Sequence, residues 1–237
     1  MAWQAVAVRT AMPHRPVLLA AAALIALTGC KGSDSPSNDQ TPDERLAEAK
    51  QSFDAAEFIE FTLASADLPS DLEGLLSAEG TGTHAPAFDG EVKVQTDFDV
   101  TAPLIAVDGD VYVKLPFSSW STIDPAGYGA PDPAQLLADD GGISSLFTAT
   151  ESLETGDERR DGENVLTDIE GTIPSESVKR VFPSTGAGDF DVTYTLTGAN
   201  DIDGVEITGP FYDGSDDVTY TIDLNLDGDP VEIEAPI

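Results

Sequence analysis

The sequence of 237 residues is short of cysteine and of basic residues. Its one cysteine, Cys30, leaves no disulfide within the chain and no site built from several thiolates. Lysine and arginine together number 11 against 44 aspartates and glutamates, which gives a formal net charge of −33. A surface this acidic repels the phosphates of nucleic acids and anionic lipid headgroups. We therefore expect neither nucleic-acid binding nor attachment to a membrane by charge alone.

Histidine is also scarce, which limits catalytic chemistry. Beyond residue 29 the one histidine is His84, in a loop near Pro86, and no Gly-x-Ser-x-Gly motif offers it a nucleophile. We interpret His84 as a solvated loop residue. The carboxylates fall mostly on the polar faces of expected strands and in Asp-Gly turns, where solubility explains them. We expect neither an enzyme nor a resident cofactor.

The first 29 residues have the parts of a secretory signal. Arg9, His14 and Arg15 form a basic start, and residues 17–27 are an uncharged apolar run too short to span a bilayer. The run ends in Leu27-Thr28-Gly29-Cys30, which resembles the lipobox of bacterial lipoproteins. The alternative is an ordinary signal peptide with a chance cysteine.

Cleavage at the lipobox would make Cys30 the first residue of a mature chain of 208 residues. Its thiol would carry diacylglycerol and its amino group an acyl chain, which would hold the protein on the outer face of the cell membrane. Loss of Arg9 and Arg15 takes the mature charge to −35. The covalent lipid, and not the protein surface, would then provide the attachment.

The mature chain divides into a tether and one domain. Residues 30–40 comprise the lipidated N-terminus and a flexible segment with no apolar side chain beyond Pro36, and residues 41–237 form a single domain. The domain opens with Thr41, Pro42 and Glu44, the pattern of a capping box with proline at the first helical position. We predict a helix to about Ala56 with Leu46, Ala49, Lys50 and Phe53 on one face.

The rest of the domain alternates with period two, as strands do. Short helical stretches over 132–137, 143–147 and 174–182 interrupt the strands and are expected to cap one sheet face. An antiparallel meander is the simplest topology. The expected strands cover residues 59–63, 92–100, 105–115 around an Asp108-Gly109 turn, 165–173, 190–196, 205–211, 218–226 and 231–233 after an Asp227-Gly228 turn.

Several short stretches, in this order, resemble the LppX/LprAFG lipoproteins of mycobacteria and related actinobacteria. They are residues 90–94, 107–113, Trp120-Ser121, Tyr128 with 132–137, and 162–165. The resemblance implies an α+β fold, in which a strongly curved antiparallel sheet, a half-barrel, carries short helices over its concave face and encloses an apolar cavity. It also implies a carrier that binds acylated lipids or glycolipids as cargo and helps move them across the envelope. A membrane transporter is a further partner consistent with such a role.

The resemblance implies that apolar residues of the matching stretches face the cavity. Each is also explained by ordinary core packing, because a filled core and a hollow one have the same sequence pattern. Val92 and Val94 are the first candidates, and the others are Phe98, Val100, Val111, Val113, Leu136, Leu146 and Phe147.

One stretch fits the spacing of a calcium loop. Asp223, Asn225 and Asp227 precede Gly228, and Glu234 stands at the twelfth position. An EF-hand needs a helix on each side, whereas a period-two strand runs through this segment. We therefore favour a β-hairpin whose Asp-Gly turn supplies positive φ, and keep weak cation binding as the alternative.

Two functions remain open. The first is binding and transfer of an acylated lipid through the cavity. The second is a structural or regulatory surface lipoprotein with a closed core, whose acidic face contacts a protein or cations. Lipid that co-purifies with the protein would distinguish them.

Overall fold

The computed structural model describes residues 40–66, 68–128, 130–183 and 185–236. The contacts divide the chain into two units, residues 1–39 and 40–237, and the second contains a complete core of its own. Cys30, the signal-like segment and nearly all of the tether lie outside the described residues, so these assignments stay predictions.

The first helix, α1 (Pro42–Ala55), begins as the sequence predicts. The Thr41 hydroxyl accepts from the backbone N–H of Glu44 at 3.3 Å, and the Glu44 carboxylate accepts from the backbone N–H of Thr41 at 2.8 Å. Leu46 and Phe53 are buried on the face that packs into the domain. Both the capping box and the apolar stripe are confirmed.

A polar network ties the start of α1 to the turn between strands β9 (Phe190–Thr197) and β10 (Ile202–Gly209). The Arg45 guanidinium donates to Asn200 Oδ1 at 2.7 Å, and Asn200 Nδ2 donates to Gln40 and Glu48. Burial lowers the pKa of Arg45, an effect that the nearby Glu158 carboxylate opposes. Residue 40 is thereby fixed beside the β9–β10 turn.

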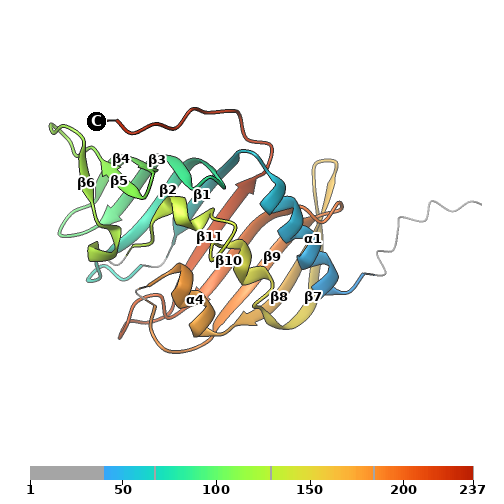
Figure 1. Ribbon diagram of the computed structural model, residues 1–237. Helices are drawn as coiled ribbons and strands as arrows, with labels where there is room; N and C mark the ends of the chain where they lie inside the picture. Colours follow the sequence, from blue (N-terminus) through green and yellow to red (C-terminus); the bar gives the residue numbers. More distant parts are fainter. Residues whose placement is uncertain (1–39, 67, 129, 184, 237) are drawn as a thin grey trace, which may run out of the picture. The chain divides into compact units, whose positions relative to one another are not determined.

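One antiparallel sheet of eleven strands forms the frame of the unit (Figure 1). Its order is β6-β5-β4-β3-β2-β1-β11-β10-β9-β8-β7, so each half is a meander and the first strand joins the last. The remaining strands are β1 (Ile59–Ser65), β2 (Gly74–Thr83), β3 (Ala87–Gln95), β4 (Val100–Val107), β5 (Asp110–Val113), β6 (Ser121–Ile123), β7 (Glu151–Asp161), β8 (Asn164–Ile173) and β11 (Val218–Asn225).

Two expected strands differ from the structure. The predicted strand over residues 92–100 is two strands, because Val94 pairs with Val100 across a turn at residues 96–99. The predicted strand over residues 231–233 does not form. Since β11 is paired on both sides, with β1 and with β10, it has no free edge for a hairpin partner.

Glycines permit a close approach between β2 and β3. Gly80 and Gly90 face each other across the two strands. A Cβ atom on Gly90 would lie 2.1 Å from the Glu79 carbonyl oxygen, and one on Gly80 would lie 2.4 Å from the Asp89 oxygen. The backbones approach more closely here than any side chain would allow. The Phe88 ring packs beside both glycines and against Phe61.

Short helices lie over one face of the sheet (Figure 1). They are α1, α2 (Pro133–Leu136), α3 (Ser144–Phe147), α4 (Ser175–Val181) and the 3-10 turn η1 (Pro125–Tyr128). The core lies between the helices and the sheet, so the predicted caps are confirmed. None of the helices in the described residues is long and apolar enough to cross a membrane.

An aromatic group fills the core under α1 and α3. Phe147 packs edge to face against both Phe53 and Tyr194, with ring centroids 6.0 and 5.1 Å apart. The Thr150 hydroxyl donates to the Leu146 carbonyl, so the Tyr194 hydroxyl donates to Thr150 at 2.7 Å. Burial raises the pKa of Tyr194 well above its usual range, and its hydroxyl stays protonated. This end of the sheet is filled.

Candidate functional site

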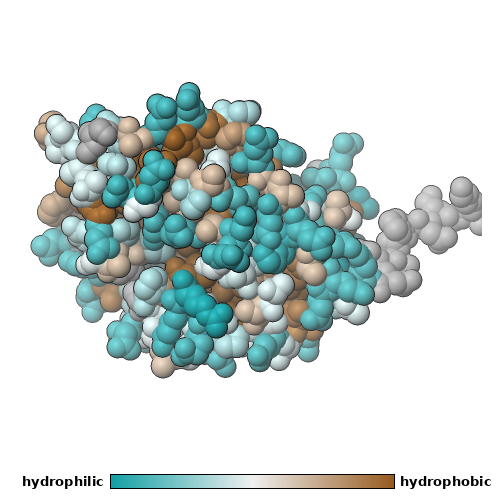
Figure 2. Space-filling model, viewed as in Figure 1, coloured by the Kyte–Doolittle hydropathy of each residue, from teal (hydrophilic) through white to brown (hydrophobic). Residues whose placement is uncertain are grey.

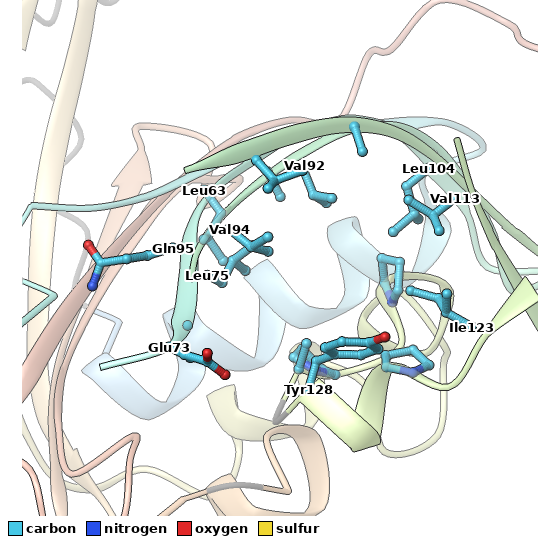
Figure 3. A pocket seen from close by; sticks show the side chains of 18 of the residues that line it. Leu63, Glu73, Leu75, Val92, Val94, Gln95, Leu104, Val113, Ile123 and Tyr128 are labelled. Atoms are coloured by element: carbon cyan, nitrogen blue, oxygen red, sulfur yellow. The ribbon is translucent and has the colours of Figure 1, made fainter. Parts of the chain in front are cut away.

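At the other end the sheet and its cover enclose an apolar cavity of about 280 Å³. Side chains from β1 to β6 line one wall, and η1 with the segment leading into α2 lines the other (Figure 3). The labelled valines and leucines project from the curved strands, and the Tyr128 ring faces them. The strand residues are Phe61, Leu63, Leu75, Ala78, Val92, Val94, Val100, Ala102, Leu104, Val113 and Ile123 of β6, and the opposite wall includes Pro125, Tyr128, Pro131, Pro133 and Leu136.

The cavity reaches one end of the strands. Antiparallel strands bring alternate connections to the same end of the sheet. Here these are the loops after β1, β3, β5 and β10, since Val94 pairs with Val100, Val113 with Ser121, and Gly209 with Val218. Residues at this end of the strands, among them Glu73, Thr96, Leu115 and Tyr212, line the cavity. We call this end of the sheet the mouth.

Two tyrosines fix the backbone at the mouth. The register of β2 slips between Leu75 and Ser77, so Leu75 needs partners beyond the strand ladder. Its N–H donates to the Tyr212 hydroxyl at 3.1 Å, and its carbonyl accepts from the Tyr220 hydroxyl at 2.8 Å. The two hydroxyls are 2.7 Å apart, which closes a ring of hydrogen bonds. A Cβ atom on Gly74 would collide with Tyr212, so this arrangement requires glycine.

The structure separates the nine cavity candidates of the sequence into three groups. Val92, Val94, Val100, Val113 and Leu136 line the cavity. Val111, Leu146 and Phe147 lie in the packed core.

The last candidate, Phe98, occupies the β3–β4 turn and is 72% exposed. Its place in the lining followed from the family resemblance together with the expectation of one strand over residues 92–100, and the turn interrupts that strand. Phe98 is therefore outside the cavity.

Apart from Leu136, neither the residues of the opposite wall nor the tyrosine pair were predicted from the sequence. The wall comes from a proline-rich segment around η1 with no strand or helix period. Tyr212 follows an expected strand directly, so position alone did not distinguish it from a loop residue. The Tyr128 and 132–137 stretches that carried the family resemblance were the available signal for this wall.

Comparison with known proteins agrees with that resemblance. A family model of LppX/LprAFG lipoproteins matches residues 41–233. The chain belongs to the LppX/LprAFG lipoprotein family. No curated protein matches the sequence.

Two solved structures of mycobacterial lipoproteins share the fold of this LppX/LprAFG protein. LprF from Mycobacterium bovis matches with a TM-score of 0.67 at 17% identity, over 82% of this chain and 96% of that one. LppX from Mycobacterium tuberculosis matches with a TM-score of 0.59 at 18% identity, over 81% and 98%. The α+β fold with one large antiparallel sheet is thus shared with these relatives.

His84 is not the solvated loop residue that the sequence predicted. Its side chain is 12% exposed and bridges two elements of the LppX/LprAFG fold. Nδ1 lies 2.6 Å from the carbonyl oxygen of Leu137, and Nε2 lies 2.8 Å from that of Phe53. The ring also packs edge-on against Phe53, and the Asp139 carboxylate is 3.3 Å from Nδ1. His84 thus links the end of α1 to the end of α2 beside the cavity.

The calcium-loop spacing does not produce a calcium loop. Asp223 and Asn225 lie on β11, and the Asn225 amide donates to Glu60 at 2.9 Å. Gly228 does not have positive φ, and its N–H donates to the Phe58 carbonyl, so the predicted hairpin turn is also wrong. Among the described residues, no group of three histidine, cysteine or acidic side chains could hold a metal ion. Glu234 lies in the extended C-terminal segment.

The acidic side chains gather elsewhere on the sheet. Glu60, Glu79, Asp89, Glu91 and Asp203 surround a shallow groove over β1, β2, β3, β10 and β11. Hydrophilic residues also cover most of the face seen in Figure 2. The apolar lining of the cavity stands apart from this acidic exterior.

Proposed function

We propose that this lipoprotein binds an acyl chain of a lipid or glycolipid in its cavity and carries it between membranes or envelope layers. The observation that supports this best is the apolar cavity that opens at the mouth. Membership of a lipoprotein family supports it further. The lining is mostly apolar, with polar side chains such as Glu73, Gln95 and Thr96 near the mouth, so it offers packing and shape to an acyl chain and favours carriage over catalysis.

The size of the cavity limits what it takes as it stands. Its volume of about 280 Å³ lies near the lower end for small-molecule pockets, roughly 300–1,000 Å³. Part of one acyl chain fits, and a lipid with several chains requires the wall of η1 and α2 to move outward. Each buried methylene contributes about 0.8 kcal/mol, which a chain leaving a bilayer must recover in the cavity. In a carrier, the free energy of burying the chain in the cavity therefore has to match that of burying it in the membrane without exceeding it.

We also propose that Cys30 carries the covalent lipid that anchors the protein on the outer face of the cell membrane. The acidic surface makes adhesion by charge unfavourable, so the anchor would keep the mouth within reach of its cargo. A transporter that hands over the cargo fits this role.

Native mass spectrometry of residues 40–237, expressed in an actinobacterial host, tests the carrier function. We expect adducts with the mass of acyl lipids. A variant with Val92→Trp should lose them, because the indole would occupy the space between the strands and Tyr128. Val165→Trp is the matched control, since Val165 is half-buried on β8 and does not line the cavity.

Circular dichroism separates a blocked cavity from a damaged fold. If the cavity is empty space, Val92→Trp melts close to the unmodified domain. A filled core would be overpacked and lose about 1–3 kcal/mol. Protein that stays free of lipid after incubation with acyl lipids would contradict the carrier proposal and favour the closed-core alternative.

A further inference from the structure

The large hydrophobic side chains exposed in the described residues lie at the mouth or on the wall of the cavity. They are Phe98, Leu115, Phe117 and Tyr128. Phe98 lies in the loop after β3, and Leu115 and Phe117 lie in the loop after β5, which is at the same end of the sheet. Leu115 and Tyr128 also line the cavity, so the apolar lining continues outward. We call these four residues the exposed rim.

Phe117 is held outward by a strained turn. The N–H of Ser118 donates to the Leu115 carbonyl at 3.1 Å, which closes a four-residue turn with Pro116 second and Phe117 third. Phe117 has a φ of 64°, as the third residue of a type II turn does, where glycine is the usual occupant. A bulky side chain in this conformation is strained, and no packing compensates it, because the ring is 111% exposed.

The charge around the rim also differs from the rest of the molecule. Residues 111–123 form the longest interval without an acidic side chain between residues 40 and 236, and they include Lys114. Asp99, beside Phe98, is paired with Lys93 at 2.9 Å. Asp97 and Asp124 also flank the rim, and Glu73 is a further carboxylate at the mouth. An anionic or zwitterionic surface meets the least repulsion here.

We infer that the exposed rim docks on the surface of a lipid bilayer, with Phe117 inserted among the headgroups. Phenylalanine, tyrosine and tryptophan are the residues that favour this interface, because their rings are apolar and several have a polar edge. Trp120 lies in the same loop. Docking would place the mouth of the cavity directly against the bilayer. The docking surface deepens the proposed carrier function, on which its purpose rests.

The chain from residue 30 onward, with Cys30→Ser to remove the anchor, tests docking on vesicles of phosphatidylcholine. Trp120 is its only tryptophan, so fluorescence reports directly on this loop. We expect co-sedimentation with the vesicles and a shift of the emission to shorter wavelength. Phe117→Gly should weaken vesicle binding by roughly tenfold, as expected for loss of a partly buried aromatic ring. The same change should leave thermal stability equal or higher, because glycine accepts the positive φ.

Ser152→Gly is the matched control. Ser152 has a φ of 55° on β7 and is not part of the rim, so its replacement relieves strain without removing an aromatic ring. Equal vesicle binding by the unmodified chain and Phe117→Gly would overturn the docking proposal, as would absence of binding by the unmodified chain. A fluorescent fatty acid offered without vesicles tests the cavity alone. If the protein binds vesicles but not the fatty acid, the result contradicts the carrier function and leaves the docking proposal supported.

Discussion

Asp203 is a residue whose ionisation works against the fold. Partial burial raises the pKa of its carboxyl, and the neighbouring Asp223 raises it further, while Arg159 opposes the shift. The folded chain therefore binds this proton more tightly than the unfolded chain. The ionised form costs stability at neutral pH, and this cost disappears as the pH falls through the folded-state pKa.

Replacing Asp203 by asparagine should accordingly raise the melting temperature at pH 7. The difference from the unmodified domain should vanish near about pH 3, where the carboxyl is protonated in both states. Thermal melts followed by circular dichroism at the two pH values measure this. Asp217→Asn removes the same charge from an exposed loop, and an equal gain there would show that net charge alone is responsible.

At the scale of single elements, β2 and β3, which both contribute to the cavity wall, approach closely at Gly80 and Gly90. Gly90→Ala would place a Cβ atom against the Glu79 carbonyl, so the two strands must separate. We expect a loss of about 1–3 kcal/mol in the free energy of unfolding, measured by urea denaturation. Gly198→Ala is the control, because the added Cβ atom would lie 4.0 Å from its nearest neighbour, the Val165 carbonyl oxygen, and we expect a change within about 0.5 kcal/mol. Equal losses in both variants would show that the close approach at Gly90 does not matter.

The elements differ in how well the sequence predicts them, and each difference has a local cause. The capping box at Thr41 and the turn at Asp108 and Gly109 are determined by neighbouring residues, and both are confirmed. β7 was missed because it lies at the edge of the sheet and exposes nearly every side chain, so it has no apolar alternation. β2 was missed because its glycines interrupt the pattern.

The cavity shows the limit of sequence reasoning more sharply. Val113 and Val111 lie two residues apart on the same strand, yet the first lines the cavity and the second is packed in the core. The difference comes from what lies opposite, which is a property of distant segments around η1 and α2. Alternation gives the face of the sheet and not the contents of the space above it.

At the scale of the whole molecule, the first described residue, Gln40, and the mouth lie at opposite ends of the strands. Gln40 accepts a hydrogen bond from Asn200 in the β9–β10 turn, whereas the mouth lies at the end of the strands where β10 ends and β11 begins. The eight residues of β9 span about 26 Å between these two ends of the sheet. Ten Cα-to-Cα steps lead from Cys30 to Gln40, and they reach at most about 36 Å when extended but only about 19 Å as a coil. With Cys30 lipidated as proposed, the length of this segment decides whether the mouth can reach the bilayer.

Deleting residues 32–37 from the lipidated chain should therefore slow loading from the membrane that holds the protein. The remaining segment would reach about 14 Å at most, which is less than the distance across the sheet. The measurement is transfer of a fluorescent fatty acid from proteoliposomes, compared with binding of the same probe in solution, which should not change. A variant in which glycine and serine replace residues 32–37 at equal length should load at the original rate. If the deletion variant loads equally fast, the shortened segment does not need to span the length of the strands for the mouth to reach the bilayer. The mouth would then have to lie nearer to the anchor than the strand ends indicate.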